Sequence, residues 1–379
     1  MTKKLYYDNA YIFDFTASVT KCIDCENKYK IYLDESVFFP EGGGQNGDRG
    51  WINDIPVLDT QEDGDDIYVI TEKCIEVGTK VDCKIDREFR MENMIKHSGE
   101  HIFSGFCCNT FDCNNVGFHM GTDGVGVDFD KQLTAEDIAK IEDMTNDKIR
   151  ENIDIVCLFP SKDEAENIDF RSKKEVDGDI RLVKIEGADL CACCGTHVKK
   201  TGEIGIVKCV SFENYKGGTR LLLKIGADAV VDYRNRNDEL LKLCAMFSAK
   251  PDTAVQNAEI FMNKSEGMKM EIAALKKELY ELRAEKVDVK NGLGYAVCEV
   301  MPPADIMSYC DAIRKIHGNA LVIAGNDESG YKFALCGDNI DGVFAEMKEE
   351  LNARGGGRNG SMQGQLVTSQ SQISAFIEK

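Results

Sequence analysis

The chain has 379 residues, of which 43% are apolar and 30% charged, a balance typical of a globular protein and not of a largely disordered one. A chain of this length is expected to form two or three domains. No stretch approaches the roughly 20 consecutive apolar residues of a membrane-spanning helix. The first residues, MTKKLYYDNAYIFDF, also lack the apolar core of a signal peptide. We therefore expect a cytoplasmic protein without membrane contact.

The net charge and the cysteine content bear on nucleic-acid binding and on the redox state of the thiols. The net charge of −20 counts against general nucleic-acid binding, because affinity for phosphates comes mainly from Lys and Arg. RNA binding would need a local basic face. The 16 cysteines are irregularly spaced in a long chain, so reduced thiols are expected, with any functional cysteine binding metal or acting in catalysis. Cys22 and Cys25 are interpreted as ordinary strand or turn cysteines.

Residues 1–85 predict a β-rich, barrel-like domain. Strand-like runs separated by Gly- and Asp-rich turns occur at Tyr29–Leu33, Ile67–Thr71 and Val81–Ile85.

Residues 86–235 predict an α+β domain. Asp86 is a good N-cap for a long helix towards Phe111, and Thr134-x-x-Asp137 resembles a capping box. Strand-like runs follow at 153–159 and 180–185, and the runs 205–211 and 219–225 predict a closing hairpin.

Residues 236–290 predict a helical, coiled-coil-like segment. Its apolar residues recur mostly in steps of three and four, at Phe261, Met268, Ile272, Leu275, Leu279 and Leu282. Such a stripe fits a helix packed on its own domain about as well as a dimer seam.

Residues 291–379 predict a small α/β domain that nearly ends in a glycine-rich loop, Arg354–Gly360.

Two short motifs indicate a metal site. Residues four apart on a helix project from one face, so the helical motif His97-Ser-Gly-Glu-His101 can present two imidazoles to one ion. Cys193-Cys-Gly-Thr-His197 supplies a second pair, although Cys191 and Cys194 flank Cys193. Two such pairs favour one zinc ion per chain. Four protein ligands are typical of a structural site, whereas catalysis usually leaves a position open.

The metal motif leaves other functions open. His97-x-x-Glu100-His101 also matches the inverted zinc-peptidase signature, in which the glutamate is the general base. For Glu100, the helix pattern favours a solvated glutamate over a catalytic base. A zinc-stabilised RNA-binding protein without turnover is a third hypothesis.

Three motifs in order carry a resemblance to a known family. Phe39-Pro-Glu-Gly-Gly-Gly-Gln45-Asn-Gly-Asp48, then HSGEH and then CCGTHV, resemble the editing half of alanyl-tRNA synthetases and the long form of free-standing AlaX-type editing proteins. The segment GGGRNGSMQGQ resembles the C-terminal domain of alanyl-tRNA synthetase. The resemblance implies a zinc-dependent hydrolase of mischarged tRNA(Ala), with seryl-tRNA(Ala) as the expected substrate, and a homodimer.

The resemblance also suggests residue roles. It makes His97, His101, Cys193 and His197 the zinc ligands. It places Gly42, Gly43 and Gly44 at the substrate, Gln45 as a hydrogen-bond donor or acceptor to it, and His119 on the pocket wall, where a core or surface histidine is the alternative. Arg220 and Arg358 are candidates for tRNA contact, against the alternative of ordinary surface charge. Synthetases often have threonine where this chain has Glu100, so discrimination is expected to differ in detail.

Overall fold

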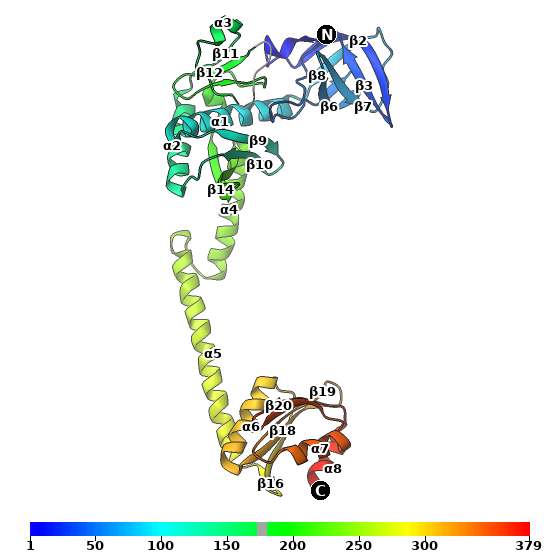
Figure 1. Cartoon of the computed structure of the whole chain (residues 1–379), viewed down its shortest axis with the longest axis vertical. Helices are drawn as coiled ribbons and strands as arrows, with labels where there is room; N and C mark the ends of the chain where they lie inside the picture. The colour runs from blue at the N-terminus through cyan, green and yellow to red at the C-terminus, as the bar shows by residue number, and fades with distance from the viewer. Residues whose placement is uncertain (173–179) are drawn as a thin grey trace. The chain divides into compact units, whose positions relative to one another are not determined.

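The computed structural model describes residues 1–172 and 180–379. The chain divides into two compact units, Met1–Leu240 and Leu241–Lys379 (Figure 1). Both contain helices and sheets, which confirms the mixed α+β class. Within the described ranges, no helix is both long and apolar enough to span a membrane.

The first unit begins with a closed barrel in the strand order β2-β3-β7-β6-β5-β8, drawn in blue in Figure 1. Its strands are β2 (Asp14–Cys25), β3 (Lys28–Leu33), β5 (Gly50–Ile52), β6 (Ile55–Asp63), β7 (Asp66–Thr71) and β8 (Lys80–Ile85), and the short strands β1 (Lys3–Lys4) and β4 (Glu35–Ser36) pair beside it. Buried and more exposed residues alternate along β7 and β8, as a barrel with a packed interior requires. The three strand-like runs predicted here are confirmed.

One cysteine pair departs from the expectation of reduced thiols. Cys22 on β2 and Cys74 after β7 form a disulfide, with their Cα atoms 6.5 Å apart. That separation lies within the usual range for a disulfide. The two residues are 52 positions apart in sequence and meet only through barrel closure, so their spacing gave no sign of the pair.

Two capped helices and two sheets complete this unit. Helix α1 (Arg87–Phe111) begins where predicted, with the Asp86 carboxylate accepting the Phe89 N–H, and α2 (Ala135–Glu151) has the predicted capping box. One sheet has the order β14-β15-β10-β9 and the other β11-β12-β13. Their strands are β9 (Asn115–Gly121), β10 (Gly124–Phe129), β11 (Ile155–Leu158), β12 (Leu182–Ile185), β13 (Asp189–Ala192), β14 (Val207–Tyr215) and β15 (Gly218–Ile225), and the short helix α3 (Lys162–Ala165) follows β11. The pairing of β14 with β15 confirms the predicted hairpin.

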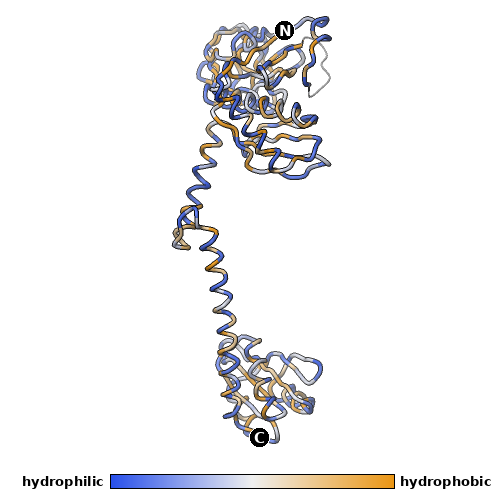
Figure 2. Tube along the Cα trace, turned by 90° about the vertical axis from the view of Figure 1, so that its left-hand side faces the viewer, coloured by the Kyte–Doolittle hydropathy of each residue, from blue (hydrophilic) through white to orange (hydrophobic). Residues whose placement is uncertain are grey.

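Two further helices follow the sheets. Helix α4 (Ala227–Met246) ends before a 3-10 turn at Pro251–Thr253, after which α5 (Ala254–Ala284) begins. Figure 2 shows apolar residues recurring along α5 among hydrophilic ones. All six residues of the predicted stripe are between 43% and 58% exposed: Phe261, Met268, Ile272, Leu275, Leu279 and Leu282.

The second unit is built on a six-stranded sheet with the order β16-β17-β18-β19-β21-β20. Its strands are β16 (Asp288–Lys290), β17 (Leu293–Cys298), β18 (Asn319–Asn326), β19 (Gly330–Cys336), β20 (Arg354–Arg358) and β21 (Ser361–Leu366), and its helices are α6 (Pro303–His317), α7 (Asp341–Glu350) and α8 (Gln370–Glu378). One apolar cluster joins α6 to the sheet, and another joins the sheet to α7 and α8.

The glycine-rich segment was wrongly expected to be a loop. Arg354–Arg358 is strand β20, paired antiparallel with β21. A Cβ on Gly357 would lie 1.8 Å from the Ser361 carbonyl oxygen. The missing side chain therefore allows two backbones to approach closely within a hairpin.

Candidate metal centre

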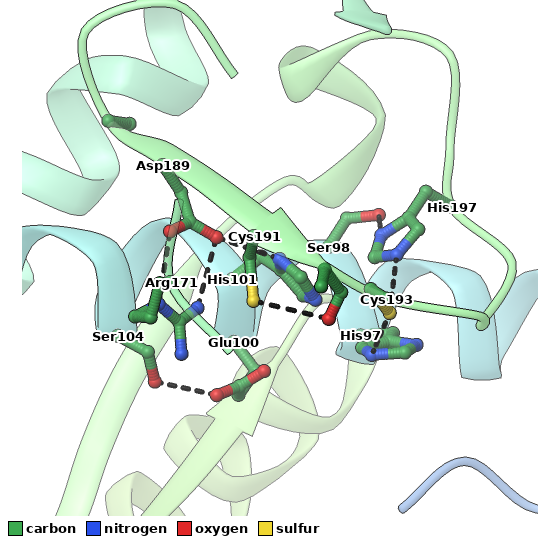
Figure 3. Close-up of polar contacts among 12 residues, drawn as sticks. His97, Ser98, Glu100, His101, Ser104, Arg171, Asp189, Cys191, Cys193 and His197 are labelled. Carbon is green, nitrogen blue, oxygen red and sulfur yellow. Dashed lines mark hydrogen bonds and ion pairs between the residues drawn. The ribbon is translucent and has the colours of Figure 1, made fainter. Parts of the chain in front are cut away.

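Four side chains from two separate segments converge on one point in the first unit (Figure 3). Helix α1 supplies His97 and His101, and the loop after β13 supplies Cys193 and His197. One ligand atom from each residue lies within 4.8 Å of the others. The three histidines are buried, whereas Cys193 is only half-buried. The structure thus brings the four predicted ligands together, and their donor atoms could hold one metal ion.

Each imidazole is oriented by a hydrogen bond at its Nδ1 atom. The partners are Gln45 Oε1 for His97 at 2.9 Å, Asp189 Oδ2 for His101 at 2.8 Å, and Ser98 Oγ for His197 at 3.2 Å. The Nε2 atoms of His97 and His197 lie 3.4 and 3.5 Å from Cys193 Sγ. Outer partners of this kind fix the ring orientation of metal-binding histidines.

The electrostatics of the cluster favour a thiolate beside a neutral imidazole. Burial opposes ionisation of Cys193, but His97 and His101 outweigh it and lower the pKa of the thiol well below its usual value. Burial, followed by the charge of His97, lowers the pKa of His197 well below its usual value. A deprotonated thiol and neutral imidazoles are the forms that bind metal.

A second set of contacts supports His101 through Asp189. The Arg171 guanidinium donates two hydrogen bonds to the Asp189 carboxylate, at 3.1 and 3.0 Å. A Cβ on Gly105 would lie 2.6 Å from Asp189 Cβ, so the glycine lets α1 and β13 approach closely. Burial would lower the pKa of His101, but Cys193 and Asp189 raise it to about 9.

The glycine motif lies against the metal cluster as a tight turn. Gly42 and Gln45 exchange backbone hydrogen bonds of 3.1 and 3.0 Å, and Gly43 and Gly44 have φ values of +60° and +85°. Positive φ at both central residues is the geometry that glycine adopts without strain. A Cβ on Gly44 would lie 2.4 Å from Phe118 Cδ1, so the turn packs directly on that ring.

Gln45 and Phe118 connect this turn to His97. Besides holding His97, the Gln45 amide donates to Thr196 Oγ1 at 2.8 Å and accepts the Thr196 N–H at 3.0 Å. Its side chain therefore joins the glycine motif to both metal-ligand segments. The substrate hydrogen bond suggested by resemblance stays a prediction. The Phe118 ring stacks on His97 with centroids 5.2 Å apart.

Glu100 is not the solvated glutamate that the helix pattern favoured. It is fully buried, and its Oε1 accepts hydrogen bonds from Ser104 Oγ and Asn115 Nδ2, both at 2.6 Å. The Glu100 carboxylate can be buried because β9 places the Asn115 amide within hydrogen-bond distance of it. Figure 3 shows the carboxylate directed towards Ser104.

Three other predicted residues lie outside the metal cluster. His119 is exposed on β9, and its ring covers Gly126, where a Cβ would lie 2.4 Å from the imidazole. Arg220 makes hydrogen bonds of 2.7 and 2.6 Å to Asp128, so its charge is paired. Arg358 is exposed at the end of β20 in the second unit.

Sequence reasoning missed several residues that support the centre. Ser98 and Gly195 lie inside the two ligand motifs, and Asp189 precedes Cys193 by four positions, so their proximity in sequence was an available signal. No local pattern marked Arg171 or Phe118, because their roles depend on how β13 and β9 pack against α1.

The chain was compared with known proteins. Residues 180–222 match the family described as the threonyl and alanyl tRNA synthetase second additional domain. The chain is 27% identical to an alanine–tRNA ligase of Ignicoccus hospitalis, covering 94% of this chain but only 40% of the ligase. It is 25% identical to the alanyl-tRNA editing protein Aarsd1-A of Xenopus laevis, covering 93% and 88% of the two chains. For the mouse alanyl-tRNA editing protein Aarsd1, the identity is 26% and the coverage 95% and 93%. The chain thus resembles editing proteins over most of its length.

Proposed function

We propose that this protein is a zinc-dependent, trans-acting deacylase that hydrolyses mischarged tRNA(Ala), with seryl-tRNA(Ala) as its substrate. The observation that carries the proposal is the set of three hydrogen bonds from the Gln45 side chain to His97 and Thr196, which joins the glycine turn to both metal-ligand segments. The glycine turn has a defined backbone conformation and packs beside the candidate metal cluster. This arrangement suits a site where a small substrate binds next to the metal ion. Relatives named for alanyl-tRNA editing support the same activity.

The donor set fits zinc. His97, His101, Cys193 and His197 offer three imidazole nitrogens and one thiolate, a common ligand combination for this ion. When bound, zinc supplies a Lewis acid that can orient and polarise an ester carbonyl. The chain's own residues keep the ligands in place: Gln45, Asp189 and Ser98 hold the three rings from outside.

The geometry around Glu100 does not favour the inverted-motif peptidase. A peptidase base must reach a water at the metal, whereas the Glu100 carboxylate accepts hydrogen bonds from Ser104 and Asn115. Purified protein should therefore deacylate a mischarged tRNA and leave unstructured peptides intact. Cleavage of peptides with intact aminoacyl-tRNA would support the peptidase. Zinc-dependent folding without any turnover would support the binding-only protein.

Gly195→Ala is expected to lower the zinc content sharply. The new methyl group would lie 2.2 Å from His97 Cε1 and 2.9 Å from Gln45 Oε1, so the ring or its supporting amide must move. Elemental analysis of purified protein measures the zinc per chain. Gly342→Ala is the matched control, because a Cβ there meets no atom within 4 Å. Wild-type zinc content in both variants would contradict the ligand geometry.

The exposed stripe on α5 supports a proposed homodimer. The residues 261, 268, 275 and 282 repeat every seven positions, and 272 and 279 fill the intervening turns, as in a coiled-coil seam. A second copy of the same helix would cover this surface. The protein is proposed to act on tRNA in the cytoplasm in this form.

Ile272→Glu with Leu275→Glu is expected to give a monomer, because two carboxylates would face each other across the seam. Ala273→Glu with Ala274→Glu adds the same charge at exposed positions beside the stripe and should leave the dimer intact. Light scattering of the full-length variants measures the mass. A dimer mass for wild type and both variants would place the dimer contact elsewhere. A monomer mass for all three would rule out the homodimer.

A further inference from the structure

An exposed aromatic ring lies at the end of a series of contacts that begins at the metal centre. Phe159 follows β11 and is 59% exposed, next to the exposed Leu158. Its ring meets Tyr7 edge-to-face, with centroids 6.2 Å apart. The Arg181 guanidinium in turn lies over the Tyr7 ring, 5.2 Å from its centroid.

Arg181 connects these rings to the metal-ligand loop. Its Nη1 donates to the Cys193 carbonyl at 2.6 Å and to the Gly195 carbonyl at 2.9 Å. The residue is only 9% exposed, and its buried Nε has no hydrogen-bond partner among the described residues. A buried guanidinium donor without an acceptor is costly, and a bound ligand that supplies an acceptor would remove that cost.

The metal-ligand loop reaches the protein surface beside these residues. Of the four predicted ligands, Cys193 is the least buried, and the next residue, Cys194, is exposed. Arg181 links the Cys193 carbonyl to the Tyr7 ring. A substrate that approaches the ion past Cys193 would therefore pass Tyr7 and Phe159.

The surface next to Phe159 suits a neutral planar group better than a phosphate. A groove of about 620 Å³ is lined by Leu158, Phe159, Pro160, Asp163, Glu164, Asn167 and Ile168. The carboxylates of Asp163 and Glu164 would repel a phosphate, whereas the apolar residues and the exposed ring can stack on a base.

From these contacts we propose that Phe159, supported by Tyr7 and Arg181, is the stacking site for the terminal adenine of the tRNA. The inference rests on the proposed function, since the adenine and the aminoacyl ester are attached to the same ribose. A base held at Phe159 is connected to the metal-ligand loop through Tyr7 and Arg181. Stacking on an aromatic side chain is a common way for proteins to hold an unpaired base.

Kinetics test the positioning role of Phe159. Phe159→Ala is expected to raise the KM for seryl-tRNA(Ala) roughly five- to a hundredfold with little change in kcat, because one base loses its stacking partner. Phe159→Trp should restore the KM. Phe212→Ala removes another exposed phenylalanine, on β14, and should behave as wild type. An active wild type with an equally active Phe159→Ala variant would overturn the adenine site and leave the deacylase assignment intact.

A binding experiment tests the site independently of turnover. Trp51 is the chain's one tryptophan, so a Trp51→Phe/Phe159→Trp variant reports from position 159 alone. Titration with the trinucleotide CCA should quench its fluorescence, whereas CC with an abasic 3′ end should not. A Trp51→Phe/Phe212→Trp variant should respond to neither. Absence of quenching by CCA at position 159 would overturn the proposal, whatever the deacylation assay shows.

Discussion

Cys193→Ser is expected to abolish both the proposed zinc binding and the proposed deacylase activity. The Cys193 thiol lies 3.4 Å from His97 Nε2 and 3.5 Å from His197 Nε2, at the centre of the ligand cluster. The neighbouring rings lower its pKa despite burial, so it is a ready thiolate that a serine hydroxyl cannot replace. Activity should fall by at least roughly a hundredfold, the upper end of the loss seen when even outer partners of a metal are removed. Elemental analysis and single-turnover deacylation measure the two effects.

Cys194→Ser is the matched control for this substitution. The side chain is exposed and lies outside the group of four converging ligands. The variant should keep its zinc and its kcat. Full zinc occupancy in Cys193→Ser would contradict Cys193 as a ligand, and loss of zinc only in Cys194→Ser would make Cys194 the ligand instead.

Arg90→Met is expected to destabilise the first unit by about 3–5 kcal/mol, because it leaves a buried carboxylate without its counter-ion. Arg90 and Asp48 form an ion pair with both side chains fully buried. The guanidinium also donates to the carbonyls of Ala10 and Val37, and Asp48 accepts the Phe39 N–H. The pair thereby connects α1 to both ends of the glycine motif.

Urea denaturation of the full chain, monitored through the unfolding transition of the first unit, measures this change in the free energy of unfolding. The double variant Arg90→Met/Asp48→Leu should recover part of the loss, since it removes both charges together. A cost below roughly 1 kcal/mol for the single variant would mean that the pair is more hydrated than its burial implies.

Local signals in the sequence predicted the elements that carry the candidate centre. The start of α1 at Arg87 and the capping box of α2 depend on side chains within one turn of the helix, so single residues such as Asp86 and Thr134 mark them. The spacing of His97 and His101 placed both on one face of α1 for the same reason. The hairpin of β14 and β15 follows from two strand-like runs joined by a short glycine-containing turn.

Features that depend on packing between distant segments could not be predicted. The burial of Glu100 depends on Asn115 from β9, and the role of Gln45 depends on Thr196, 151 residues further along the chain. The disulfide of Cys22 with Cys74 forms through barrel closure. The sequence of β20 predicts a loop because glycine-rich sequence usually marks turns, whereas in the structure the glycines allow close backbone pairing.

The most direct test of the proposed function is the hydrolysis of seryl-tRNA(Ala) and alanyl-tRNA(Ala) by the same zinc-loaded preparation. We expect rapid loss of serine from the first, much slower loss of alanine from the second, and loss of both activities when a chelator removes the zinc. A site that hydrogen-bonds the serine hydroxyl would give this discrimination. Equal rates on the two tRNAs would contradict the substrate assignment, and intact seryl-tRNA(Ala) after incubation with zinc-loaded protein would contradict the deacylase itself.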